Sequence, residues 1–225
     1  MKRQALLEEF LPREAQQAYV ILLLFCGVAL FLSIPFEQYV SQPSITGSLQ
    51  FPSAFFATYV LFMCFVGLNR GGAYARRDRR SRSLLHIVMQ LFTAQLLVLP
   101  YLIFTRSAFL GHEWRIVLAA LYVSLASFLA ALIGVHIESR PVHRPSRHVG
   151  LKYLIVGCYF VAPLLVALVT PHVGRYVSVV SPFSAVLQLL AGPPLQVALI
   201  AFLIPTVMIW LLIGRRWERP RKVRP

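Results

Sequence analysis

Residues 70–83 read RGGAYARRDRRSRS and place six arginines in one short segment. An apolar stretch precedes this segment at Phe51–Leu68, and another follows it at Leu84–Thr105. Each stretch is close to the roughly 20 mainly apolar residues that one crossing of a bilayer requires. Because basic loops remain on the cytoplasmic side of a membrane, the sequence predicts two transmembrane helices joined by a cytoplasmic loop.

The same alternation of apolar and basic segments extends over the whole chain. Further apolar stretches lie at Ala18–Ile34, Ile116–Ile137, Leu151–Val169 and Leu195–Ile213. Nineteen of the 22 Lys and Arg residues fall in four segments, and the segments between them hold only Arg106, Arg115 and Arg175. This asymmetry predicts an all-α bundle of six transmembrane helices with both termini in the cytoplasm.

The composition is typical of an integral membrane protein. Hydrophobic residues make up 58% of the chain and charged residues only 13%, whereas a soluble domain is about 25% charged. The net charge of +14 lies mostly on one predicted side, where anionic lipid headgroups attract basic residues. We therefore expect contact with anionic lipid and no nucleic-acid partner. The inside bias, with no obvious cleavable signal in the first apolar stretch, predicts a cell inner (plasma) membrane.

The predicted topology divides the chain into residues 1–17, 18–214 and 215–225. Apolar residues recur at helical spacing in the first part, at Leu6, Leu7, Phe10, Leu11 and Ala15. This spacing predicts a cytoplasmic amphipathic helix in the membrane interface, although Pro12 leaves a frayed tail as the alternative. The second part is the six-helix transmembrane domain, and the third is a basic cytoplasmic tail.

A shorter apolar segment precedes the last predicted span. Ser181 and Pro182 are typical of a helix start, Phe183–Ala191 is almost wholly apolar, and Gly192 with two prolines ends it. About nine residues cannot cross a bilayer. We expect a re-entrant helix packed between the spans, with a helix lying on the membrane surface as the alternative.

Residues that could carry chemistry are sparse. All eight acidic residues, and all Lys and Arg residues, lie outside the middle of the apolar stretches, which argues against an ion-coupled transporter or an intramembrane protease. Glu8, Glu9 and Arg13 match the acidic signature of membrane CAAX-processing proteases, but we interpret them as a salt-bridged interfacial helix. No phosphate-loop motif occurs. We predict no enzyme activity, no metal and no cofactor in this chain.

Two histidines leave one alternative open. His86 lies near the start of the third predicted span and His136 near the end of the fourth. Two such residues could ligate haem between helices, or each could lie at the interface with its polar edge in water.

The basic segment at residues 70–83 also permits two interpretations. Gly71 and Gly72 are predicted to interrupt the second helix, after which Tyr74–Ser83 can form a short polar helix. This helix is either a charge cluster that sets topology or a docking site for a cytoplasmic partner.

The order of these features resembles the membrane subunit of an ABC exporter of the second type. An interfacial helix precedes the first span, a basic helical loop follows the second, and SFLAALIG at residues 127–134 leads into a second basic loop. Pro163 lies in the fifth span, and SPFS at residues 181–184 precedes the sixth. Asp78 stands near the position of an acidic residue in such loops, and Ser83-Leu84-Leu85 resembles the entry into the third helix.

The resemblance implies a permease that binds no ATP itself. It would work with a cytoplasmic ATPase subunit and a second permease subunit, as a homodimer or a heterodimer. The implied docking residues are Tyr74, Arg76, Arg77, Asp78, Arg79 and Arg80, and the implied extracellular gate contains Ser181, Pro182 and Phe183. The lack of charge within the spans favours an apolar or amphipathic cargo. A non-transporting scaffold or assembly factor and a haem- or quinone-binding subunit are the other interpretations.

Overall fold

The computed structural model describes residues 50–76, 84–107, 113–139, 145–169, 179–192 and 195–217, and scattered positions between 17 and 28. Within these residues the regular structure is helical. The helices are α4 (Gln50–Arg76), α5 (Leu84–Ser107), α6 (Glu113–Glu138), α7 (Pro145–Val169), α9 (Pro182–Ala191) and α10 (Leu195–Trp217). The predicted all-α class is confirmed for this part of the chain.

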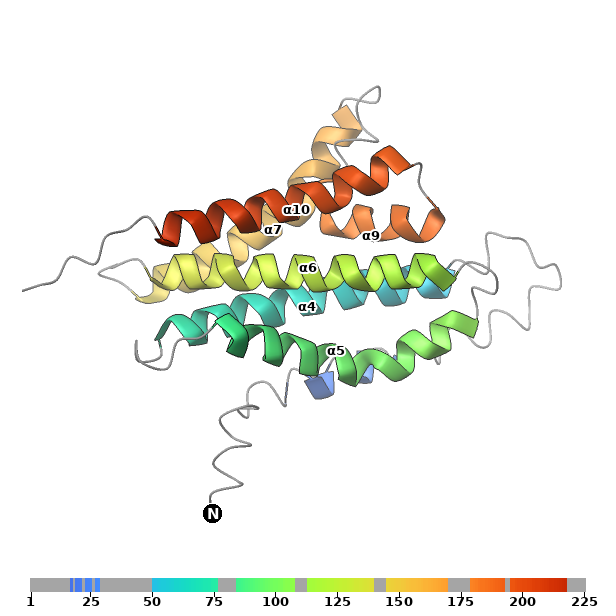
Figure 1. The fold of residues 1–225 in the computed structure, drawn as a ribbon, viewed down its shortest axis with the longest axis horizontal. Coiled ribbons are helices and arrows are strands. Elements are labelled where there is room, and N and C mark those ends of the chain that lie inside the picture. The colour runs from blue at the N-terminus through green and yellow to red at the C-terminus, as the bar shows by residue number, and fades with distance from the viewer. Residues whose placement is uncertain are drawn as a thin grey trace, which may run out of the picture.

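The long helices alternate in direction along the bundle (Figure 1). Helices α4, α6 and α10 run one way, and α5 and α7 run the other way, so the junctions α4–α5 and α6–α7 lie at the same end as the end of α10. In the sequence, three of the four basic segments adjoin these helix ends. The fold therefore brings together helix ends that lie far apart in the chain and that each adjoin a basic segment.

Helix α6 is the centre of the bundle. It contacts α4, α5, α7, α9 and α10, and its contact with α4 is by far the most extensive. Figure 1 shows α5 on one side of the α4–α6 pair and α10 with α9 on the other. Small residues at positions 126, 127, 130, 131 and 134 are buried along α6, which lets its neighbours approach closely.

The α4–α6 contact is made by backbone against backbone. A Cβ atom added at Gly67 would collide with the Ser127 carbonyl, and one added at Gly71 would collide with the backbone of Ala131. From the other side, a Cβ atom on Gly134 would collide with the Leu68 carbonyl. Gly67 and Gly71 are four residues apart, as are Ser127 and Ala131, which is the spacing of small residues in close transmembrane crossings.

This crossing corrects one detail of the sequence prediction. Gly71 and Gly72 do not interrupt the helix, because α4 continues through them to Arg76. Glycine weakens a helix, but here the absence of a side chain permits the close approach of α6. Tyr74 consequently belongs to α4, and its side chain is only 4% exposed. Residues 77–83, the rest of the predicted polar helix, lie outside the described residues.

Three of the described helices are long and apolar enough to cross a membrane. They contain Phe55–Ala75, Glu113–Glu138 and Leu195–Ile213, which correspond to the second, fourth and sixth predicted spans. The apolar runs described in α5 and α7 are shorter, Ile87–Ile103 and Leu154–Pro163. Much of the first predicted span and the whole predicted interfacial helix fall outside the described residues, apart from Gln17. The count of six spans stays a prediction.

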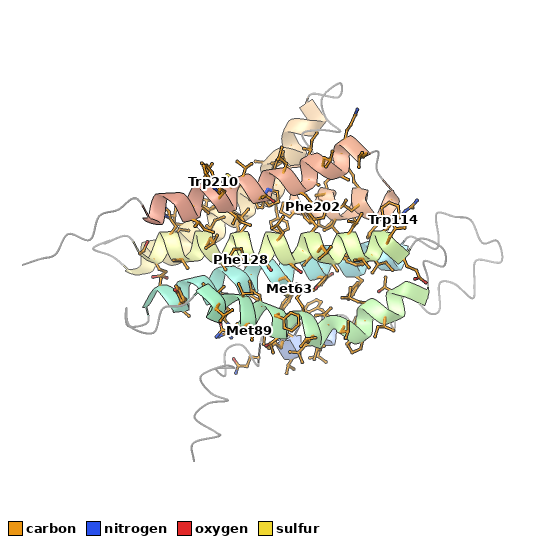
Figure 2. All side chains as sticks on the ribbon, viewed as in Figure 1. Met63, Met89, Trp114, Phe128, Phe202 and Trp210 are labelled. Atoms are coloured by element: carbon orange, nitrogen blue, oxygen red, sulfur yellow. The ribbon has the colours of Figure 1, made fainter. Side chains whose placement is uncertain are left out.

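Exposed apolar side chains cover the outward faces of the bundle. On α10, Leu199 and Leu203 are each 61% exposed and Trp210 is 72% exposed. Figure 2 shows Trp210 directed away from the bundle, whereas Phe202 on the same helix points toward α6. A soluble monomer rarely exposes apolar surface on this scale, whereas lipid tails can cover it. These exposed apolar faces are therefore consistent with three helices that are long and apolar enough to cross a membrane.

Candidate functional site

Helix α9 is the feature that departs from a plain helical bundle. It has 10 residues, a length of about 15 Å at 1.5 Å per residue. Its start at Pro182 and its end at Gly192, which adopts a left-handed φ of 82°, match the sequence prediction. Figure 1 shows α9 beside the N-terminal half of α6. A helix of this length covers only half the depth of its long neighbours.

One face of α9 is buried in the bundle. The buried residues are Pro182, Ala185, Val186, Leu189 and Leu190, and their spacing of three and four places them on one side of a helix. This face packs against α4 and α6, and α7 also contacts the helix. Phe183, at 37% exposure, lies on the open side. Of the three predicted gate residues, Ser181 and Pro182 are therefore buried and Phe183 is partly exposed.

Ser181 fixes the start of α9 to α7. The sequence predicts a cap at this position, but the Ser181 hydroxyl makes no hydrogen bond within its own helix. It donates instead to the Phe160 carbonyl at 2.7 Å, and the Ser181 side chain is fully buried. Phe160 lies three residues before Pro163, and a proline leaves the carbonyl four residues before it without a helical N–H donor. The hydroxyl thus binds the carbonyl next to the one that the α7 proline frees.

Arg115 holds the other end of α9. Its Nη1 atom donates to the Leu190 carbonyl at 3.4 Å and to the Ala191 carbonyl at 3.3 Å. The last carbonyls of a helix have no partner within it and carry partial negative charge, which a guanidinium stabilises. The guanidinium also lies 5.6 Å from the Trp114 ring centroid. It fills the space beside Gly192 so closely that a Cβ atom there would overlap it.

The role of Arg115 was not found from the sequence. There it is one of three basic residues on the poorly charged side of the predicted topology. Its partners lie 75 and 76 positions further along the chain, and no local pattern connects residues so far apart. The close crossing of α4 and α6 did have a signal, because Gly67 and Gly71 show the G-x-x-x-G spacing within an apolar helix.

Three uncharged polar side chains from three helices form a polar cluster in the bundle. Cys64 from α4, Tyr122 from α6 and Tyr159 from α7 interact with one another. Tyr122 also packs edge-on against Phe202 of α10, with 5.8 Å between ring centroids. The Tyr159 hydroxyl is buried and lacks a hydrogen-bond partner of good geometry. These groups can bind a neutral polar atom, and they carry no formal charge with which to hold an ion.

The structure tests little of the predicted docking segment. Tyr74 is buried in the core, so in this conformation its side chain does not offer a docking surface. Arg76 is the last residue of α4. Arg77, Asp78, Arg79 and Arg80 lie outside the described residues. The docking role of this segment stays a prediction.

The haem-binding alternative rests on His86 and His136. His86 lies near the start of α5, His136 lies in the last turn of α6, and these two helices contact each other. Among the described residues, no group of three or more His, Cys, Asp or Glu side chains could hold a metal ion.

Comparisons of the chain with known protein families, with curated proteins and with solved structures found no match in any of the three. The site is therefore interpreted from its own geometry.

Proposed function

We propose that the protein is the permease subunit of an ABC exporter, with six spans and both termini on the cytoplasmic side of a cell inner membrane. The observation that carries the proposal is α9. A 10-residue helix between α7 and α10, with one face packed on α4 and α6, is the half-depth element that the resemblance places before the last span. It supports the interpretation of α9 as a re-entrant helix.

The arrangement of the basic segments supports a cytoplasmic partner. The α4–α5 and α6–α7 junctions and the end of α10 lie at one end of the bundle (Figure 1), and α9 lies in the opposite half. An ATPase subunit docked on the segment from Arg76 to Arg80 and a gate at Ser181, Pro182 and Phe183 would then act at opposite ends. A second permease subunit completes the translocation path, and this chain hydrolyses no ATP.

The interior of the bundle supports an apolar or amphipathic cargo. The polar cluster of Cys64, Tyr122 and Tyr159 can hydrogen-bond but carries no formal charge. Charged groups within membranes usually mark ion or proton paths. Arg115 lies near the start of α6, seven residues before Tyr122.

Purification of the tagged chain from mild detergent, with its partners identified by mass spectrometry, tests the proposal. We expect a stoichiometric subunit with a phosphate-loop ATPase signature. A monodisperse preparation without such a subunit would overturn the permease assignment. A stoichiometric partner lacking ATPase motifs would support the scaffold interpretation instead, and a haem absorption band would support the redox interpretation.

A set of charge reversals tests the docking segment separately. Replacing Arg76, Arg77, Arg79 and Arg80 by Glu is expected to reduce co-purification of the ATPase about tenfold or more, because each docking contact of an arginine loses its complementary charge. The matched control reverses the same number of basic residues in the next basic segment of the sequence, Arg140, Arg144, Arg147 and Lys152. Equal loss in both variants, or no loss in either, contradicts a docking role for the α4–α5 segment.

A further inference from the structure

The two ends of α9 are held in different ways. At its start, the Ser181 hydroxyl donates one short hydrogen bond of 2.7 Å to Phe160, and Ser181 is fully buried. At its end, a single nitrogen of Arg115 makes two longer hydrogen bonds, of 3.3 and 3.4 Å. Hydrogen bonds weaken as they lengthen beyond about 3.0 Å. The bond at the start is therefore shorter than either bond at the end, although the donor at the end is charged.

The surroundings of the two ends differ in part. The buried face runs from Ala185 at 0% exposure to Leu189 and Leu190 at 1%, and only the last two residues, Ala191 and Gly192, are exposed. The start can move only by opening the packed core, which interiors resist. The end can move outward once the two hydrogen bonds are lost and Leu189 and Leu190 leave the core, which would expose position 189.

The guanidinium of Arg115 does not use all of its hydrogen-bond donors in this position. Its Nε atom is buried without a hydrogen-bond partner, although a guanidinium carries five N–H donors. An unsatisfied buried donor lowers the stability of the position that buries it. The arrangement thus stabilises the position of α9 less than a fully bonded guanidinium would.

We infer that Arg115 is a positioning residue whose contacts with Leu190 and Ala191 form a releasable latch, and that α9 turns about Ser181 when this latch opens. The exposed end of α9 then moves away from α6 while its first turn stays in the core. The movement serves as a gate only if the proposed function holds, whereas the contacts exist independently of it.

Cysteine labelling of the full-length chain in proteoliposomes tests the latch. In a background with Cys26, Cys64 and Cys158 replaced by Ala, one reporter is Leu189→Cys near the latch, and the other is Ala185→Cys near Ser181. Both native side chains are buried. The probe is a membrane-impermeant maleimide. We expect Arg115→Gln to raise the labelling rate at position 189 about tenfold and to leave the rate at position 185 unchanged.

Two further variants separate the latch from general damage. Gly192→Ala should also raise labelling at position 189, because the added Cβ atom takes the place of the guanidinium and the left-handed φ of 82° strains an alanine at the same end of α9. It tests whether the end of α9 can be released even if Arg115→Gln does not fold. Arg115→Lys should restore part of the protection, since an ammonium group can still bind a carbonyl. Arg175→Gln removes one charge from the same predicted side and should have no effect.

Unchanged labelling at position 189 in both Arg115→Gln and Gly192→Ala overturns the latch. An equal rise at positions 189 and 185 overturns the pivot at Ser181, because the whole helix would then have left the bundle. Neither result depends on an ATPase partner. If the latch is found but ATP and the co-purified ATPase do not change labelling of the unmutated latch, the failure belongs to the proposed function.

Discussion

The α4–α6 crossing and the attachment of α9 join helices by different atoms. Between α4 and α6 the backbones themselves are in contact at Gly67, Gly71 and Gly134. Helix α9 is joined to its neighbours by apolar side chains and by hydrogen bonds from Ser181 and Arg115 to carbonyl oxygens. Lipid tails are as apolar as leucine, so helices in a membrane associate through close packing and hydrogen bonds. Backbone contact holds α4 and α6 in one relative arrangement, whereas an attachment made by side chains can break and form again.

Close backbone contact also explains why α6 is central. A side chain at a helix contact can change rotamer, but the carbonyls of Leu68 and Ser127 cannot move without bending a helix. We therefore regard the α4–α6 pair as the rigid part of the bundle, and the elements joined by side chains as the parts that can move.

The largest expected effect comes from filling the crossing. Gly71→Leu places a side chain where the Ala131 backbone lies. Overpacking of a core costs about 1–3 kcal/mol and occasionally more, and because the obstacle is backbone we expect about 3 kcal/mol or more. Unfolding in mixed detergent micelles, with the free energy extrapolated to the non-denaturing detergent, measures the loss.

The chain provides a matched control for this substitution. Gly157 lies within α7, and no heavy atom lies within 4 Å of the position that its Cβ atom would take. Gly157→Leu is therefore expected to be neutral or slightly stabilising, since leucine favours a helix by about 0.8 kcal/mol over glycine. If Gly71→Leu is as stable as Gly157→Leu, the crossing is not the rigid part of the bundle.

The sequence predicted the elements better than the contacts between them. The apolar runs gave the long helices to within a few residues at most ends, and Ser181-Pro182 with Gly192 gave both ends of α9. These are local properties, because hydrophobic length and helix-ending residues are visible in a short window. The prediction that Gly71 and Gly72 interrupt the second helix was wrong, because glycine can end one helix and permit close packing in another.

The missed contacts share a physical reason. Ser181 and Phe160 are 21 positions apart, and Arg115 binds carbonyls 75 and 76 positions away. Both acceptors are backbone carbonyls, which every residue possesses, so no residue type in the sequence marks the partner. Only the placement of α9 against α6 and α7 brings donor and acceptor together.

An intermediate effect is expected from the start of α9. Ser181→Ala removes the side-chain donor to the Phe160 carbonyl and with it the hydrogen bond between α9 and α7. Hydrogen bonds between helices in membranes contribute about 0.6 kcal/mol on average and up to about 1.7 kcal/mol. We expect a loss of about 1 kcal/mol in the same unfolding measurement, because the pair is short and fully buried.

Ser124→Ala provides the comparison for Ser181→Ala. The Ser124 hydroxyl donates to the Ala120 carbonyl of its own helix at 2.9 Å, and such bonds within one helix add little to stability. The difference between the two variants then measures the attachment of α9 to α7. Equal stabilities would mean that apolar packing alone holds the start of α9, and that Ser181 is not its pivot.

The smallest effect is expected where a longer hydrogen bond reaches a peripheral segment. The Tyr101 hydroxyl donates to the Leu23 carbonyl at 3.1 Å, while its ring stacks on Phe55 with 6.2 Å between centroids. Tyr101→Phe keeps the ring and removes the hydroxyl that makes this hydrogen bond, so we expect a loss of at most about 0.6 kcal/mol. Tyr101→Leu also removes the stacking, worth about 0.5–1.5 kcal/mol, and should be the less stable of the two. A loss from Tyr101→Phe as large as that from Ser181→Ala would show that bond length and burial do not rank these attachments. The distinction between a fixed crossing and releasable side-chain contacts would then have to rest on the glycines alone.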